Sequence, residues 1–158
     1  MMLKALKLSV LIAGILFAAL QFVRPARSNP PVSEAQSVGA HLRLTPEVET
    51  ILARSCMDCH SNKTEWPLYS YVAPASWLVI DHVNEGRREM NFSEWGSYGR
   101  DRADYLLKDI CRTVKHGEMP MSSYTLIHRS AKLSRADALT LCEWSQAERT
   151  RLAASPAL

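Results

Sequence analysis

Hydrophobic residues first gather in an unbroken run near the N-terminus. Lys4 and Lys7 precede an apolar stretch over residues 8–23, in which only Ser9 and Gln21 are polar. A helix in a soluble core carries its apolar residues along one face, whereas this stretch is apolar all round. Basic residues followed by such a stretch predict an export signal or a membrane anchor.

This stretch is either removed as a signal peptide or kept as an anchor. Signal peptidase needs two small residues just before the cut, and neither residues 17–20 nor residues 24–26 offer a good pair. A membrane-spanning helix needs roughly 20 residues, which residues 2–23 supply if the two lysines extend towards the headgroups. We expect residues 1–27 to form an uncleaved signal anchor, with a cleaved signal peptide as the alternative. Residues 28–44 then form an extended polar stalk.

Beyond the stalk, apolar positions recur at helical spacing. Thr45-Pro46-Glu47 supplies a capping hydroxyl, a first-turn proline and an acid, which predict a helix running into Cys56. Further helices are expected from 73–76 to Gly86, over about 101–116 with Gly117 as C-terminal cap, and from Ser134 onward. The expected inward residues are Val48, Ile51, Leu52, Trp77, Leu78, Ile80, Val83, Ala103, Leu106, Leu107, Ile110, Val114, Ala138, Leu141, Cys142 and Ser145.

No stretch alternates like a strand, so we expect an all-α domain over residues 45–150. Long loops fall at 61–74, 87–100 and 117–132, and such loops are uncommon unless something organises them. The first two loops hold Trp66, Tyr69, Tyr71, Phe92, Trp95 and Tyr98 in or near them. A small domain with short helices needs another large apolar object to complete its core.

Composition narrows the choice of function. The chain has 158 residues, 47% hydrophobic and 22% charged, and a net charge of +3, which fits one globular domain plus the N-terminal segment. The charge is too weak, and too evenly spread, to predict binding to nucleic acid. Four cysteines are too few for a disulfide scaffold.

Two of these cysteines form the motif C-x-x-C-H over residues 56–60. Cys56 and Cys59 are three residues apart on one side of a helical turn, so both sulfurs can form thioethers with the vinyl groups of one haem. His60 follows directly and can donate a ring nitrogen to the iron. A thioredoxin-like dithiol would need a βαβ pattern, and a zinc site would have to recruit Cys111 and Cys142, which lack a second C-x-x-C pair. We therefore expect one covalently attached haem c.

The second axial ligand is expected from a loop after the third helix. Met119 lies between Gly117, which ends that helix, and Pro120, and methionine is a common second ligand in small c-type cytochromes. Met121 and Met90 are the alternative methionines. The histidines at 41, 82, 116 and 128 are further alternatives, and an open coordination position is another.

Other candidate residues surround this expected haem. Trp66, Trp77 and Trp95 are expected either to pack on the haem or to belong to the ordinary core. Cys111 and Cys142 occupy core-facing helical positions, where a disulfide in an oxidising compartment and two buried free thiols are equally consistent.

The chain resembles a bacterial haem-binding domain family with a single C-x-x-C-H motif. The residues that carry the resemblance are 56–62, 66–70, 73–78, Gly86-Arg87, 91–95, 117–120, Tyr124, His128, Leu133-Ser134 and Trp144. The resemblance covers roughly residues 45–147, and residues 21–31 look like the leader of such proteins. It implies a cytochrome c-like domain facing the periplasm, with Cys56, Cys59 and His60 as haem residues and Met119 as distal ligand.

These observations predict an electron-transfer protein rather than an enzyme. We expect a monohaem cytochrome in the bacterial periplasm, anchored to the inner membrane, whose partners are other redox proteins. No nucleophile–base pair or carboxylate pair suggests catalysis. A haem-based sensor or gas-binding module, or a small peroxidase with an open distal site, is the alternative.

Overall fold

The computed structural model describes residues 2–154, and every regular element within them is helical. The α-helices are α1 (Met2–Leu20), α2 (Val38–His41), α3 (Pro46–Ser55), α4 (Met57–His60), α5 (Ala75–Glu89), α6 (Arg100–Lys115), α7 (Ser122–Ile127) and α8 (Arg135–Ala154). The 3-10 turns are η1 (Glu34–Gln36), η2 (Leu68–Tyr71), η3 (Phe92–Ser97) and η4 (Arg129–Ala131). The all-α prediction is confirmed.

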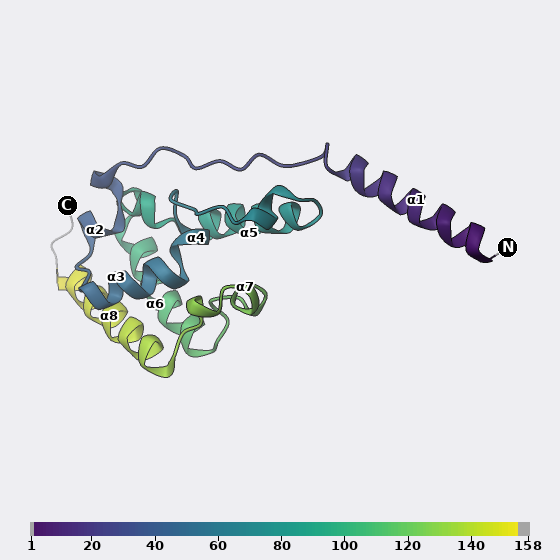
Figure 1. The fold of residues 1–158 in the computed structure, drawn as a ribbon. Helices are drawn as coiled ribbons and strands as arrows, with labels where there is room; N and C mark the ends of the chain where they lie inside the picture. The colour runs from purple at the N-terminus through teal and green to yellow at the C-terminus, as the bar shows by residue number, and fades with distance from the viewer. Residues whose placement is uncertain (1, 155–158) are drawn as a thin grey trace.

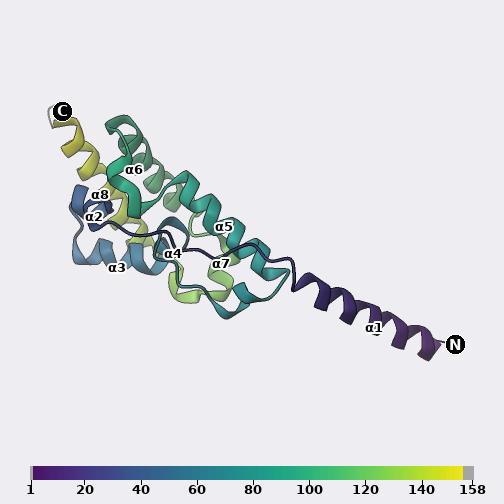
Figure 2. The same cartoon turned by 90° about the horizontal axis from the view of Figure 1, so that it is seen from above.

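The N-terminal helix α1 stands outside the helical domain. Both views show it pointing away from the other helices, to which an extended segment connects it (Figure 1, Figure 2). None of its residues is buried, and it is long and apolar enough to cross a membrane. An apolar helix in this position is typical of a signal sequence or a membrane anchor.

The core forms where α8 packs along α6 and against α3. All five residues predicted to face inward from α6 are buried, and so are the three predicted from α3. Phe92 and Trp95 of η3 complete this core, with their rings stacked at a centroid distance of 5.9 Å. The structure places Trp95 in this core.

Specific end groups set the limits of these helices. The Thr45 hydroxyl accepts a hydrogen bond from the Val48 backbone at the start of α3. At the start of α8, the Ser134 backbone donates to Asp137, and the Asp137 backbone donates to the Ser134 hydroxyl. Both start signals predicted from the sequence are therefore present.

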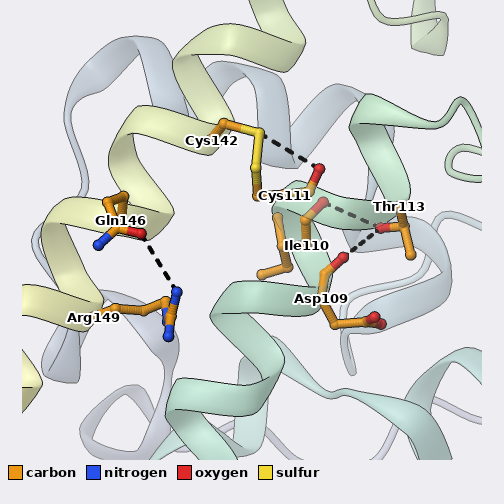
Figure 3. The surroundings of a disulfide bond; sticks show 7 residues. All are labelled: Asp109, Ile110, Cys111, Thr113, Cys142, Gln146 and Arg149. Atoms are coloured by element: carbon orange, nitrogen blue, oxygen red, sulfur yellow. Dashed lines mark hydrogen bonds between the residues drawn. A yellow bond between two sulfur atoms is a disulfide. The ribbon is translucent and has the colours of Figure 1, made fainter.

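A disulfide bond links the two longest helices of the domain. It joins Cys111 of α6 to Cys142 of α8, with 4.5 Å between their Cα atoms (Figure 3). The bond leaves Cys56 and Cys59 as the free cysteines. The cross-link encloses residues 112–141, and so spans α7 and the segment that contains Met119.

Residues 28–44 differ from the expected polar stalk. Val38 and Leu42 are 3% and 4% exposed and belong to the core. The Arg43 carbonyl accepts a hydrogen bond from the Trp144 indole, and Asn29 donates to the Thr64 carbonyl. Val38 and Leu42, four residues apart, lie on the same side of one helical turn and bury together, so this part of the expected stalk packs against the domain.

Helix α5 and the loop at 117–132 also differ from the sequence prediction. Helix α5 continues past Gly86 to Glu89, and Leu78 on this helix is 56% exposed rather than buried. The loop at 117–132 contains α7, whose sequence has no long apolar period to reveal it. Short helices of this kind are determined by tertiary contacts more than by local propensity.

Candidate functional site

The C-x-x-C-H motif forms a separate single turn at the end of α3. Cys56 ends α3, and its backbone donates to the Leu52 carbonyl. The Cys56 carbonyl then accepts hydrogen bonds from the backbones of Cys59 and His60, at 3.2 and 3.0 Å. This turn, α4, therefore presents both thiols and the imidazole to the same space.

Two adjoining cavities meet at this turn, and we call them together the motif cleft. The first is lined by Ser55, Cys56, Cys59, His60, His82, Glu85, Gly86, Glu89, Met119, Pro120, Met121 and Tyr124. The second shares Cys59, His82, Met121 and Tyr124 with it, and extends between α5 and α7 over mainly apolar side chains. The cleft has the apolar walls and the few polar groups that are typical of a cofactor site.

His60 is held in an orientation suited to binding a metal through one nitrogen. Its Nδ1 lies 3.1 Å from the Met90 carbonyl, and because a carbonyl only accepts, Nδ1 carries the proton. Nε2 is then left as the basic nitrogen. Burial lowers the pKa of His60 and outweighs the opposing effects of the Met90 and Gly86 carbonyls and of Glu89. The imidazole is therefore neutral at neutral pH, as a ligand must be.

The two thiols of the cleft lack the features of a reactive dithiol. Burial, with a smaller contribution from Cys59, raises the pKa of Cys56 to about 12. Burial and the nearby Asp58 carboxylate raise the pKa of Cys59 to about 11. Redox-active cysteines have lowered pKa values instead. Among the described residues, no group of three or more His, Cys, Asp or Glu side chains is arranged to hold a metal ion.

Gly86 brings α5 against the motif, a role that the sequence did not reveal. A Cβ atom at this position would lie 2.6 Å from the Cys59 carbonyl oxygen and 3.1 Å from its carbon. Only glycine permits so close an approach of helix to backbone. Its neighbour Arg87 donates to the Ser61 carbonyl at 2.7 Å and to the Thr64 hydroxyl at 2.8 Å.

A buried asparagine pair holds the residues that follow the motif. The Asn62 backbone donates to the Ser93 hydroxyl at 3.0 Å, and the Asn91 side chain donates to the Asn62 side-chain oxygen at 2.8 Å. Asn91 also accepts from the Ser93 backbone, which starts η3. These contacts tie residues 61–62 to residues 91–93 and so fix the segment that directly follows His60.

Met119 reaches the cleft from the end of α6. Gly117 has a φ of 69°, the left-handed conformation that suits glycine at a helix C-terminus. The Gly117 backbone donates to the Val114 carbonyl and the Glu118 backbone donates to the Thr113 carbonyl, so the helix ends here in a Schellman motif. Met119 follows directly, and its side chain is 38% exposed while lining the same cavity as His60.

Some of the alternative methionine and histidine ligands line the motif cleft, and others lie outside it. Met121 and His82 also line the motif cleft, and His82 belongs to both of its cavities. Met90 instead caps α5 with its carbonyl on His60 and its side chain packed against the core. Neither His41 nor His116 lines the cleft: the first bonds the Ala35 carbonyl, and the second lies near Glu118.

Aromatic and polar side chains join α7 to the motif. The Tyr124 hydroxyl donates to Asp58 at 2.7 Å, and the Tyr124 ring stacks on His128 with 4.4 Å between the ring centroids. The Tyr69 hydroxyl lies 2.6 Å from His128 Nε2 in a second hydrogen bond. Burial, assisted by Asp58, raises the pKa of both tyrosines, so both remain neutral hydrogen-bonding groups.

None of the three candidate tryptophans lines the motif cleft. Trp95 lies in the core, and the Trp77 indole donates to the Val23 carbonyl near the end of α1. Trp66 is partly buried between Glu65 and Pro67, which themselves line the cleft. The aromatic residues that do line it are Tyr69 and Tyr124.

A comparison with protein families supports the chemistry of this site. The family model described as a haem-binding domain matches residues 15–147, which include α4, the motif cleft and the last turns of α1. Searches of curated proteins and of solved structures gave no significant match. A neutral imidazole on the cleft wall can bind haem iron, and the two thiols beside it are the groups that covalent attachment of a haem would use. The chain belongs to the haem-binding domain family.

Proposed function

We propose that this protein is a monohaem c-type cytochrome that carries electrons on the periplasmic side of the bacterial inner membrane. One observation carries the proposal: Cys56, Cys59 and His60 line a single cavity together with Met119. Two sulfurs for covalent attachment and two axial ligands are the full set that such a centre needs.

Each of these residues has a distinct part. Cys56 and Cys59 would form the thioethers, and His60 would bind the iron through Nε2 while the Met90 carbonyl orients its ring. Met119 would supply the second axial ligand. Haem contributes one-electron chemistry between ferrous and ferric iron, and the apolar side chains of α5 and α7 keep water from it.

The anchor is proposed to remain on the mature protein. Gln21 and Arg24, directly after α1, donate hydrogen bonds to the carbonyls of Ala73 and Tyr71. Cleavage after residue 26 would remove these contacts from the domain. The family match also begins within α1, at residue 15, which supports treating this segment as part of the family domain.

A second candidate function is a gas-binding or sensing module. It is favoured by the exposure of Met119, because a ligand on a solvent-exposed loop is more easily displaced. A peroxidase would need a free acid–base group near the iron, and His128, which lines the cleft, is already hydrogen-bonded to Tyr69.

Spectra of the holoprotein test the proposed ligands. The protein is expressed with haem-attachment machinery and compared with Met119→Ala and with the matched control Met121→Ala. We expect the long-wavelength methionine–iron band to vanish only in Met119→Ala, and carbon monoxide to bind that variant while the wild type resists it. A band that survives in Met119→Ala would refute the ligand, and a mature chain without added haem mass would refute the cytochrome.

A further inference from the structure

The end of α1 is fixed to the domain by side-chain contacts rather than joined by a loose linker. The Gln21 amide both donates to the Ala73 carbonyl, at 3.1 Å, and accepts from the Ala73 backbone, at 3.0 Å. Arg24 donates to the Tyr71 carbonyl at 2.7 Å, and the Trp77 indole donates to the Val23 carbonyl. The membrane-spanning helix and the start of α5 therefore hold one orientation relative to each other.

Exposed apolar side chains gather at this same end of the domain. Phe22 is 91% exposed, Leu68 87% and Val23 67%, while Tyr71 and Val72 are each 45% exposed. We call these residues, with Trp77, the anchor-side surface. Figure 1 shows α1 leaving the domain at the end where α5 begins, so these side chains lie next to the point at which the chain enters the membrane.

The charges of the two segments fit a lipid headgroup layer. Residues 20–33 and 66–80 contain no acidic residue, and the first of them contains Arg24 and Arg27. The Arg27 guanidinium lies 3.7 Å from the centroid of the Tyr71 ring and donates to the Ser70 carbonyl. Arginine, tyrosine and tryptophan are the residues that concentrate at membrane interfaces, and basic residues there attract anionic lipids.

We propose that the anchor-side surface lies in the headgroup region of the membrane that α1 spans. This inference rests on the proposed function in one respect, the retention of α1. The helical domain is then held against the bilayer in a fixed orientation, with the motif cleft in a constant position relative to the membrane. If the anchor-side surface faced water instead, its large apolar side chains would stay exposed next to a membrane interface that can cover them.

Site-directed spin labelling of the full-length holoprotein tests this surface. The protein is reconstituted into vesicles of phosphatidylethanolamine and phosphatidylglycerol, with the label on Leu68→Cys or Val72→Cys. The matched control is Leu139→Cys on α8, whose wild-type side chain is 60% exposed. We measure relaxation enhancement by oxygen, which partitions into lipid, and by a water-soluble nickel chelate. Wild-type protein treated with the same label corrects for labelling of native thiols.

The expected result is an oxygen-to-chelate ratio several-fold higher at positions 68 and 72 than at position 139. Equal ratios at the three positions, in a protein whose mass includes α1, would overturn the membrane contact and leave the anchor intact. A mature chain that lacks α1 would refute the anchor and this surface together. The labelled positions are exposed, so we expect each variant to fold normally. The haem spectrum of each variant checks this folding separately.

Discussion

Gly86 is a single residue on which the shape of the motif cleft depends. Alanine normally stabilises a helix relative to glycine, but here its Cβ would meet the Cys59 carbonyl oxygen at 2.6 Å. We expect Gly86→Ala to cost about 1–3 kcal/mol of unfolding free energy, as overpacked cores do, and to lower haem incorporation. Denaturant unfolding and haem content measure both effects.

The control for Gly86→Ala is Gly39→Ala. Gly39 is also helical, but a Cβ there meets only the end of Leu44, at 3.9 Å. Equal stability of the two variants would show that α5 can move away from Cys59 without cost.

Asp137 makes stability depend on pH in the acid range. Partial burial would raise its pKa, but hydrogen bonds from Ser134 and the Arg54 guanidinium 2.9 Å away together lower it below the ordinary value. Because the folded pKa is the lower one, the carboxylate stabilises the fold above its ordinary pKa of about 4, and this contribution is lost as the pH falls through the folded value.

We therefore expect Asp137→Asn to cost about 1 kcal/mol at neutral pH, the usual value of a helix cap. This difference from wild type shrinks as the pH falls below about 4. Urea unfolding across pH measures it, with the exposed Asp81→Asn as control. A difference that stays constant down to acid pH would contradict the role of ionised Asp137.

Sequence reasoning located the motif residues because their chemistry depends on spacing within one turn. It predicted Met119 as the second ligand ahead of Met121, and this choice stays a prediction because both residues line the cleft. It could not assign Trp95, whose place in the core depends on how η3 packs against α2 and η1. A residue such as Gly86 gives no local signal, because its partner Cys59 lies in a different helix.

At the scale of helices, α6 and α8 form the frame that positions the Met119 segment. Their disulfide links residues 31 positions apart. Removing such a cross-link frees the unfolded chain, and for a loop of this length we expect Cys111→Ser with Cys142→Ser to cost about 3 kcal/mol. Urea unfolding with and without reductant measures the loss.

Reductant provides the internal control for the disulfide. It should destabilise the wild type and leave the double variant unchanged. Alkylation of the thiols shows whether the reductant has opened the disulfide. If the disulfide is open and the unfolding free energy of the wild type has not changed, the cross-link does not stabilise the fold.

The long helices were predictable because their apolar period and end groups are local in the sequence. The inward faces of α3 and α6 and the start of α8 at Ser134 all follow from such patterns. In contrast, α7 is six residues long and is held by Tyr124 and His128 through partners on α4 and η2. Contacts between distant segments determine it, so no local pattern reveals it.

At the scale of the whole molecule, Arg87 connects three segments. It donates to the carbonyls of Ser28 and Ser61 and to the side chains of Asn29 and Thr64. Lysine keeps the charge but cannot supply this planar fork of donors. We expect Arg87→Lys to cost about 2 kcal/mol, the value of lost bonds to a charged group, and to loosen the N-terminal segment.

Limited proteolysis and thermal unfolding measure the effect of Arg87→Lys. The control is the neighbouring Arg88→Lys, which changes only an exposed ion pair with Glu85 and should cost less than about 1 kcal/mol. Similar losses for the two variants would argue against a special role of Arg87. The packing of residues 28–44 was not apparent from the sequence for the same reason, since their partners lie on segments far along the chain.

The hydrogen bond between His60 and the Met90 carbonyl has a consequence for how this protein tolerates substitutions at position 90. The acceptor is a backbone carbonyl oxygen. Any amino acid at position 90 that keeps the same backbone shape therefore presents the same atom to the imidazole. The fold, and not a side chain, therefore sets the basicity of the ligand that His60 is proposed to supply. Substitutions at position 90 that keep the backbone shape would leave the proposed iron ligand unchanged.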